Sequence, residues 1–368
     1  MELITRQDVI NIINKYNSKD ITVGTIGSHS ALEIMDGAKD ENMKTLCICE
    51  KGREIPYRRF KRITDEIVLL DKFSDIMSKE NQRRLIQSNT IIIAHRAFTA
   101  YLGYDNIETK LYVPIFGNRS LLRAEERNAH RNQYYLLEKA RIKHPRIYDK
   151  ASDIDGLAVV KIQEAKRKLE RAFFLVSSYE DFKRKSKSRV EKGLITEEDI
   201  NSAIIEEYII GTHFNFNFFS SPLKEETEFL GIERRLQTNI NDFTSLLPAK
   251  QQMEIEIEPQ NIEVGHTPAS IRESLLEKVF EIGDRFTASV RQEYPPGIIG
   301  PFSLQSIVTL ELDLVVYDVS LRVPGNPIMA TTSPYTKYYH GYTMGVGRRT
   351  AMEIKNAITE ERLEDIVT

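Results

Sequence analysis

The sequence predicts an α/β domain with a doubly wound parallel sheet, followed by a region of α+β character. Its first third alternates short apolar runs with segments rich in helix-forming residues, which is typical of an open sheet covered by helices on both faces. Beyond residue 156, β runs follow one another as they do in antiparallel hairpins. The chain has 368 residues, which is long enough for two or three compact units.

Composition narrows the class of protein. The net charge is −3, so electrostatics give no reason to expect a nucleic acid or an anionic membrane as partner. No apolar stretch approaches the ~18–20 residues needed to span a bilayer, and no basic-then-apolar leader opens the chain. Cys47 and Cys49 are the only cysteines, and they are too close in sequence for an easy disulfide. These observations predict a cytoplasmic protein.

The N-terminal region is expected to start with a helix and a buried strand. Apolar residues at helical spacing in residues 9–13 predict the helix, and the apolar run at residues 21–26 predicts the strand. Residues 27–30 break this strand, and helical spacing resumes at Ala31. Further buried strands are predicted at residues 45–49, 66–70 and 90–94.

A change of character follows the N-terminal region. Residues 119–143 are strongly charged and contain good helix formers throughout, and residues 149–156 read as a linker. Residues 157–161 and 172–176 then form two β runs joined by a charged loop, which predicts an antiparallel hairpin. Two late strands are expected at residues 302–309 and 312–319.

Residues 213–218 alternate strictly between polar and aromatic side chains. Alternate residues of a strand point to opposite faces, so this strand is expected to bury three rings on one side and to show polar groups on the other. The rings belong to Phe214, Phe216 and Phe218, and the polar side chains to His213, Asn215 and Asn217.

Two groups of residues in the central β runs could take part in ligand binding. Lys161 ends an apolar strand just before a loop, where an amine can meet phosphate oxygens, although a solvated lysine is the commoner reading. Glu206 and Glu207 are adjacent in a β run that ends at Gly211. They point to opposite faces, so at least one carboxylate needs solvent, a cation or a donor-bearing ligand. An edge strand with one wet face explains the pair equally well.

The two late strands each carry one oxygen ligand, Gln305 and Asp318. Side chains on neighbouring strands can reach one magnesium ion, which prefers a few hard oxygens together with the phosphates of its substrate. Arg322 follows and offers a planar fork for phosphate or carboxylate. A plain salt bridge between Asp318 and Arg322 is the alternative reading.

A polar turn follows the first strand at residues 27–30, and His95-Arg96 follows the strand at 90–94. Ligands of open α/β sheets gather beyond the carboxyl ends of the strands, where both segments are expected. Free backbone donors at the start of the next helix favour an anion there. Helix capping by Ser28 or Ser30 explains the serines equally well.

Six segments carry a resemblance that runs over nearly the full length. They are TIGSHS (25–30), KGREIPY (51–57), VPIFGNR (113–119), EEYIIG (206–211), IRESLL (271–276) and PPGIIGPF (295–302). With the order of the elements, they make the chain similar to ATP-grasp enzymes. More narrowly, it resembles the formate-dependent synthetases that convert the purine intermediate AICAR, aminoimidazole carboxamide ribonucleotide, to its formylated product FAICAR.

This resemblance implies a division of the chain and an assembly. Residues 1–124 would form the doubly wound domain, residues 125–210 a lid subdomain, and residues 211–368 the ATP-grasp core with the C-terminal part. Related synthetases assemble into homo-oligomers, so an oligomer is expected here too.

The resemblance also implies ligands and roles. ATP, formate and AICAR would be the substrates of a carbon–nitrogen ligase, with magnesium, or manganese as the alternative, as the metal. Formate would attack the γ-phosphate of ATP, and the AICAR amine would then attack formyl phosphate. The implied residues are His29, Ser30, Ala97 and Asn239 for the nucleotide substrate; Lys161, Glu206, Glu207, Tyr208 and Ile209 for ATP; Gln305 and Asp318 for the metal; and Lys161 and Arg322 for catalysis.

Several parts of the chain depart from the family pattern, among them residues 323–327, where the family has a turn rich in glycine and threonine. Residues 162–171 contain no glycine where the family has a glycine-rich loop, although Lys166, Arg167 and Lys168 could supply charge instead. Ala97 stands in place of a substrate-contacting serine, and Asp318 in place of a glutamate. Two other hypotheses therefore stay open: a diverged paralogue that joins another acid or nucleotide, and a nucleotide-binding protein without catalysis.

Overall fold

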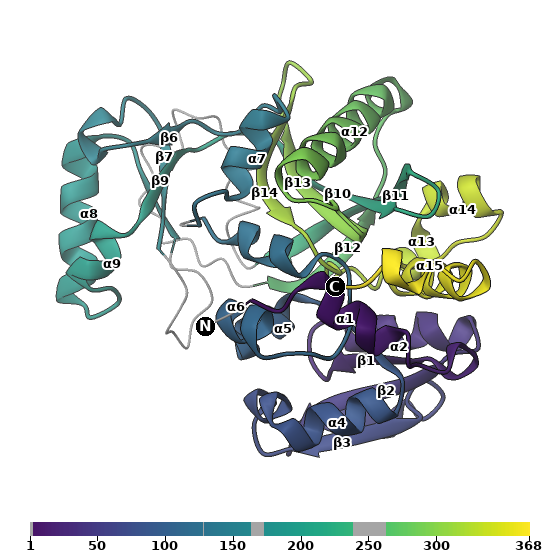
Figure 1. Ribbon diagram of the computed structural model, residues 1–368. Coiled ribbons are helices and arrows are strands. Elements are labelled where there is room, and N and C mark those ends of the chain that lie inside the picture. Colours follow the sequence, from purple (N-terminus) through teal and green to yellow (C-terminus); the bar gives the residue numbers. More distant parts are fainter. Residues whose placement is uncertain (1–2, 128, 163–172, 238–262) are drawn as a thin grey trace.

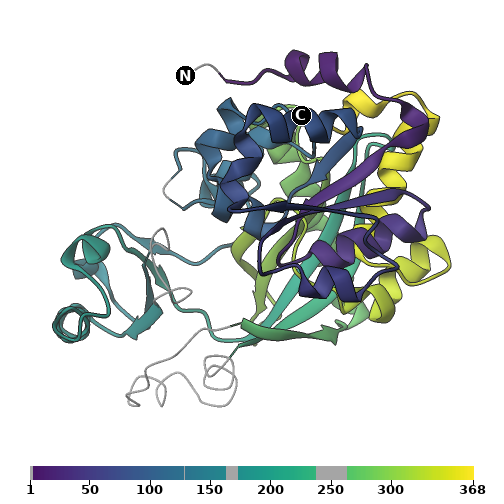
Figure 2. The same ribbon diagram turned by 90° about the horizontal axis from the view of Figure 1, so that it is seen from below.

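The computed structural model describes residues 3–127, 129–162, 173–237 and 263–368. Three sheets organise this part of the chain: a five-stranded parallel sheet, a four-stranded antiparallel sheet and a five-stranded antiparallel sheet (Figure 1). The four-stranded sheet and its helices stand to one side of the body formed by the other two, as both views show (Figure 2). Every helix in the described ranges is too short or too polar to span a bilayer.

The parallel sheet has the strand order β3-β2-β1-β4-β5. Its strands are β1 (Thr22–Ile26), β2 (Lys44–Glu50), β3 (Glu66–Leu70), β4 (Thr90–Ile93) and β5 (Ile115–Phe116). Its helices are α1 (Arg6–Ile13), α2 (Ala31–Asp40), α3 (Ile55–Arg59), α4 (Lys79–Gln87), α5 (Arg96–Leu102) and α6 (Tyr104–Thr109). The first four strands lie where their apolar runs predict them, and their pairings are parallel as expected.

Alternation along β2 explains how both faces of this sheet are covered. Leu46 and Ile48 pack on the face that α4 and α5 cover. Cys47 and Cys49 pack on the other face, against Ala31 of α2, and both thiols are free. A strand buried on both faces needs this continuous apolar run, which is why the parallel sheet could be read from the sequence.

The four-stranded sheet has the order β6-β9-β7-β8. Its elements are β6 (Ile147–Tyr148), β7 (Ala158–Lys161), β8 (Phe173–Val176), α8 (Tyr179–Glu191), α9 (Glu197–Asn201) and β9 (Ile204–Glu207). β7 and β8 pair antiparallel, which confirms the predicted hairpin. Val160, Phe174 and Ile205 belong to a hydrophobic cluster that this unit forms by itself.

The antiparallel five-stranded sheet has the order β12-β11-β10-β13-β14. Its strands are β10 (Thr212–Ser221), β11 (Glu226–Gln237), β12 (Glu263–Ala269), β13 (Gly300–Val308) and β14 (Leu314–Ser320). The helices of this region are α7 (Gln133–Lys139), α12 (Leu276–Glu293), α13 (Met329–Thr332), α14 (Pro334–His340) and α15 (Val346–Thr359). The two late strands are therefore confirmed.

The alternation in β10 is confirmed on one face and wrong on the other. Phe216 and Phe218 are buried in the cluster that includes residues of α12, and Phe214 packs against it. The opposite face was expected to show its polar groups, yet Asn215 and Asn217 are 3% and 0% exposed. Hydrogen bonding makes this burial tolerable, since each side-chain amide donates to a group of the protein.

Two helices pack on elements that are distant from them in the sequence. α15, from the end of the chain, packs closely on α2 of the parallel-sheet domain (Figure 1). α7 packs on α12 of the antiparallel region, although it lies before β6 in the chain. The four-stranded sheet itself is built from residues 147–207. The division at residues 124 and 210 stays a prediction.

Candidate active site

A cavity of ≈ 580 Å³ lies where the three units face one another. Charged side chains from all three units line it, with cations in excess of carboxylates. The cations are Arg96, Arg123, Arg127, Lys161 and Arg322, and the carboxylates are Glu125, Glu126 and Asp318. A concave site with excess positive charge attracts an anionic ligand.

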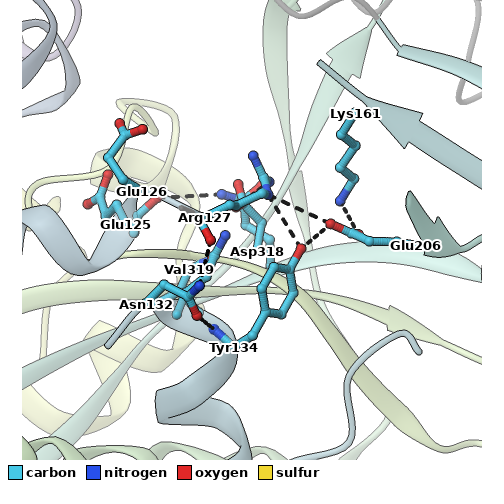
Figure 3. Close-up of polar contacts among 12 residues, drawn as sticks. Glu125, Glu126, Arg127, Asn132, Tyr134, Lys161, Glu206, Asp318 and Val319 are labelled. Carbon is cyan, nitrogen blue, oxygen red and sulfur yellow. Dashed lines mark hydrogen bonds and ion pairs between the residues drawn. The ribbon is translucent and has the colours of Figure 1, made fainter. Parts of the chain in front are cut away.

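Lys161 ends β7 and points toward Glu206 of the neighbouring strand β9 (Figure 3). Its ammonium donates a hydrogen bond to Glu206 Oε2, and the Tyr134 hydroxyl donates to Oε1 of the same carboxylate. Both members of the Lys161–Glu206 pair are buried, at 8% and 1% exposure. Burial lowers the pKa of Lys161, and the charge of Glu206 opposes this shift.

Arg127 lies beside Asp318 and Glu206 (Figure 3). Its Nη2 donates to Asp318 Oδ1 at 2.8 Å, and its Nε lies 3.8 Å from Glu206 Oε1. Burial alone would lower the pKa of Arg127, but Asp318, Tyr134 and Glu206 outweigh burial and raise it. Arg127 therefore remains charged in the site.

Arg322 forms an ion pair with Glu125, with 3.3 Å between Nε and Oε1. Glu125 Oε1 also accepts a hydrogen bond from the Leu321 N–H at 2.6 Å. Burial lowers the pKa of Arg322, and the Glu125 carboxylate acts against this shift. The plain salt bridge between Asp318 and Arg322, weighed as an alternative, is replaced by two other pairs: Asp318 with Arg127, and Arg322 with Glu125.

Gln305 and Asp318 face one another as Cα partners across β13 and β14. The Gln305 side-chain amide donates to Ser320 Oγ at 3.4 Å. The described residues contain no cluster of three or more His, Cys, Asp or Glu able to hold a metal alone. One carboxylate and one amide oxygen on adjacent strands still fit magnesium, because magnesium takes the rest of its ligands from phosphates and water.

His29 and Ser30 lie at the start of α2, next to the segment that follows Arg322. Ser30 Oγ donates to the Pro324 carbonyl at 3.1 Å, and a Cβ on Gly325 would lie 2.4 Å from His29 Cε1. The His29 backbone has a φ of 47°, in the left-handed region. The turn after β1 and the segment after β14 are therefore packed directly together.

Ala97 is buried in the first turn of α5, where its N–H donates to His95 Nδ1 at 3.2 Å. His95 Nε2 contacts the Ile26 carbonyl oxygen at 2.9 Å, and its ring stacks on His29 at 5.9 Å. Burial lowers the pKa of His95 to about 4, so this imidazole is neutral near pH 7. The two segments expected beyond the parallel strands meet here.

Glu207, Tyr208 and Ile209, which were predicted to bind ATP, are not among the residues that line the cavity. Glu207 points away from Glu206, as expected for adjacent residues of a strand, and accepts the Arg146 N–H at 3.2 Å. Tyr208 and Ile209 lie on the connection from β9 to β10, and the Tyr208 hydroxyl is buried. Asn239 and the charged loop at residues 163–171 lie outside the described residues.

Sequence reasoning missed Arg127, Tyr134 and the two glutamates that precede Arg127. Glu126 accepts a hydrogen bond from Tyr104 at 2.9 Å, close to Arg96. A run of charges between helix formers normally indicates a solvated surface. The run Glu125-Glu126-Arg127 was the available signal, but only tertiary contacts reveal which groups these side chains pair with.

Family models match most of the chain. Residues 181–368 match a model described as "Domain of unknown function (DUF1297)", and residues 23–148 match one described as "Protein of unknown function (DUF1246)". The first covers half of the chain, including β10 to β14 and α15.

Relatives of known name match from end to end. Two of them are proteins named 5-formaminoimidazole-4-carboxamide-1-(beta)-D-ribofuranosyl 5'-monophosphate synthetase, from Methanocaldococcus jannaschii and Methanothermobacter thermautotrophicus. Each is 42% identical to this chain, and each match covers 100% of both proteins. A protein of the same name from Methanopyrus kandleri is 38% identical over 100% of both.

Solved structures are also similar to this chain over most of its length. The IMP biosynthesis protein PurP from Thermococcus kodakaraensis superposes with a TM-score of 0.70 and 27% identity, covering 94% of this chain and 100% of that one. The ADP complex of N5-carboxyaminoimidazole ribonucleotide synthetase superposes with a TM-score of 0.57 and 13% identity, covering 89% of this chain and 78% of that one. The latter shows the fold alone, and it confirms the predicted ATP-grasp architecture. The full-length identity shows that the chain belongs to the family of 5-formaminoimidazole-4-carboxamide-1-(beta)-D-ribofuranosyl 5'-monophosphate synthetases.

Proposed function

We propose that this chain is an ATP-dependent ligase of purine biosynthesis that forms FAICAR from AICAR and formate and releases ADP and phosphate. The observation that carries the proposal is the convergence of Lys161, Asp318 and Arg322, from two separate sheets, on one cavity with excess positive charge. Such a cavity suits the phosphates of ATP and of a ribonucleotide. The names of the full-length relatives supply the identity of the product, FAICAR.

We assign the ATP site to the seam between the two antiparallel sheets. Lys161 would contact phosphate oxygens from the end of β7, with Glu206 holding its ammonium in place. Glu207, Tyr208 and Ile209 would hold the nucleotide from the strand end and connection between the two sheets. A connection in this position can bind a flat base with its backbone groups.

We assign the nucleotide substrate to the region where the starts of α2 and α5 meet the segment after Arg322. Arg96 and Arg322 line the cavity, whereas His29, Ser30 and Ala97 are not among its lining residues. His29 and Ser30 would contact the substrate from the start of α2, with Ala97 beside them in α5. Asn239 would reach the imidazole carboxamide end, in a part of the chain outside the described residues. Ala97 has no hydroxyl, so the contact made by serine in the family would be lost here.

The proposed chemistry has two steps. A formate oxygen attacks the γ-phosphorus of ATP, the bond from that phosphorus to the bridging oxygen breaks, and ADP leaves. The AICAR amine then attacks the carbonyl carbon of formyl phosphate, phosphate leaves with the former formate oxygen, and the nitrogen loses one proton. Lys161 and Arg322 would stabilise the negative charge that develops on the phosphate oxygens in both steps.

We assign metal binding to Gln305 and Asp318, with magnesium favoured and manganese as the alternative. When bound, the metal would neutralise charge on the phosphate oxygens. Formyl phosphate reacts with water, so the site must also be shielded. We expect the four-stranded sheet, which stands apart from the body, to close over the cavity as a lid (Figure 2). A homo-oligomer and a cytoplasmic location remain part of the proposal.

The test is phosphate release by the purified protein with ATP, magnesium, formate and AICAR, with each component omitted in turn. The nucleotide product would be identified by mass spectrometry. FAICAR formed only in the complete mixture is the expected result. Turnover with a different acid or amine would replace the proposal by that of a diverged paralogue, and ATP binding without turnover would replace it by that of a non-catalytic protein.

A further inference from the structure

Arg127 shares the buried carboxylates of the cavity with Lys161. Its guanidinium donates to Asp318 Oδ1 at 2.8 Å and lies 3.8 Å from Glu206 Oε1, while Lys161 holds the other oxygen of Glu206. Asp318 and Glu206 are 9% and 1% exposed at the side chain. Two cations therefore lie against two buried carboxylates (Figure 3).

Arg127 occupies Oδ1 of Asp318, so a metal that binds this oxygen would displace the guanidinium. We propose that Arg127 neutralises Asp318 until a metal binds this carboxylate. Arg127 then leaves Asp318 and contacts the phosphate oxygens of ATP. This inference rests on the proposed function, because it needs ATP and a divalent metal as ligands. It assigns a phosphate-binding role to a residue outside the predicted site.

The surrounding structure allows Arg127 to move while Asp318 stays in place. Asp318 lies in β14, which is paired along its length with β13. Arg127 lies between the short 3₁₀ helix Arg119–Glu125 and α7, and it lines the cavity. Its carbonyl accepts the Asn132 side-chain amide at 2.5 Å, which anchors the backbone next to it. The exchange therefore requires only a rotation of the Arg127 side chain over a fixed backbone.

This exchange of partners makes the affinity for the metal depend on whether a nucleotide is bound. If a metal alone takes Asp318, Arg127 loses its closest carboxylate and keeps only Glu206, which already pairs with Lys161. Loss of a partner from a largely buried ion pair is unfavourable. If the metal arrives with a nucleotide, phosphate oxygens become the new partners of Arg127. The native protein should therefore bind the metal weakly alone and much more tightly with nucleotide.

The experiment measures Mn²⁺ binding by electron paramagnetic resonance, with and without ADP, for the native protein and for Arg127→Met. In the variant, Mn²⁺ alone is expected to bind on the order of tenfold more tightly, because Asp318 is free, and the tightening caused by ADP is expected to shrink by a similar factor. kcat for ATP turnover should fall ~10²-fold. Arg131→Met is the matched control. Arg131 contacts the Glu293 carbonyl, outside the cavity, so its variant should bind Mn²⁺ like the native protein.

A folded Arg127→Met variant that binds Mn²⁺ alone no more tightly than the native protein would overturn the inference. If this variant does not fold, Arg127→Lys decides, since it keeps the charge on a compact ammonium. In Arg127→Lys, ADP should still tighten the binding of Mn²⁺, while kcat falls. A normal kcat would contradict the contact between Arg127 and the phosphate oxygens. Mn²⁺ binding needs neither formate nor AICAR, so a failure of the proposed reaction is distinguishable from a failure of this inference.

Discussion

The sequence predicts Asp318 as a metal ligand, but it does not predict the contact between Asp318 and Arg127. The position of Asp318 on a late strand opposite Gln305 follows from the apolar pattern of the two strands, and the same pattern places Lys161 at a strand end. Its partner Arg127 lies 191 residues earlier, in a charged segment that reads as solvated. Local patterns can thus place the strand-end residues of the site, but not the side chains that neutralise them.

Replacing Asp318 by alanine should remove activity without unfolding the chain. The substitution deletes the proposed carboxylate ligand of the metal, so ATP turnover is expected to fall ~10³-fold. Asp313→Ala is the control, because Asp313 lies on the connection between the same strands and forms an exposed ion pair with Lys143. Turnover and circular dichroism should be measured for both variants. Normal turnover by Asp318→Ala would exclude the metal assignment.

Glu33 should make stability depend on pH. Burial raises its pKa to about 7, although hydrogen bonds from the N–H groups of Val346 and Gly347 act against this shift. The folded state therefore binds a proton more tightly than the unfolded state, whose carboxyl has an ordinary pKa of 4.5. The stabilisation is fully present below pH ~4.5 and is lost as the pH rises to about 7, by up to ~3 kcal/mol.

The variant Glu33→Gln should flatten this dependence, because an amide is neutral at every pH and can still accept from Val346. Urea unfolding between pH 4.5 and 8 measures the effect. The two proteins should have similar stability near pH 4.5, which serves as the internal control, and the variant should be the more stable near pH 8. Parallel stability curves would show that Glu33 does not titrate in this range.

At the scale of elements, the contact between α2 and α15 depends on two glycines. A Cβ on Gly37 would lie 2.0 Å from the Arg348 nitrogen, and a Cβ on Gly347 would lie 2.3 Å from the Glu33 carbonyl oxygen. The helix backbones are therefore closer than any side chain allows. The apolar spacing of each helix can be read from the sequence, but a contact between residues more than 300 positions apart cannot.

Gly37→Ala should separate these two helices. Alanine favours a helix more than glycine does, so any loss of stability must come from the clash with α15. We expect the free energy of unfolding to fall by at least ~2 kcal/mol in urea titrations. Gly156→Ala is the matched control, since a Cβ there meets nothing within 4 Å. Equal stability of both variants would contradict the close packing.

The sequence also predicted the wrong environment for one face of the strand β10, and the reason applies to strands in general. The polar face of β10 was expected to meet solvent because polar residues usually do. Asn215 and Asn217 are instead buried: the Asn215 amide donates to Glu233 of the neighbouring strand β11, and the Asn217 amide contacts Met329 of α13. The pattern of one strand shows which residues share a face, but not whether that face is covered by another part of the chain.

For the whole molecule, the three sheets differ in how they share their hydrophobic cores. The parallel sheet shares a cluster with α15 and with β10 and β11, since Ile91, Phe219, Leu230 and Ile354 belong to the same one. The four-stranded sheet has its own smaller cluster, which includes Val160 and Phe174. The alternation of elements could predict the two kinds of domain, but not which of them share a core.

The four-stranded sheet should therefore open independently. Hydrogen exchange under native conditions is expected to give amides of β7 to β9 an opening free energy a few kcal/mol below that of β1 and β10. Added ATP should raise the protection of β7 to β9 most, because Lys161 and Glu206 lie there. β3, which is remote from the cavity, serves as the internal reference. Uniform protection across all three sheets would contradict an independent unit.

The return of α15 to α2 has a consequence for synthesis on the ribosome. The parallel-sheet domain is translated first, yet one face of it is completed by residues 346–359, and its edge strand β5 pairs with Val367 and Thr368. Nascent domains usually fold in the order in which they emerge. Here the first domain to emerge must wait until residues 346–368 have left the exit tunnel, so a chain that stops before these residues leaves its first sheet uncovered.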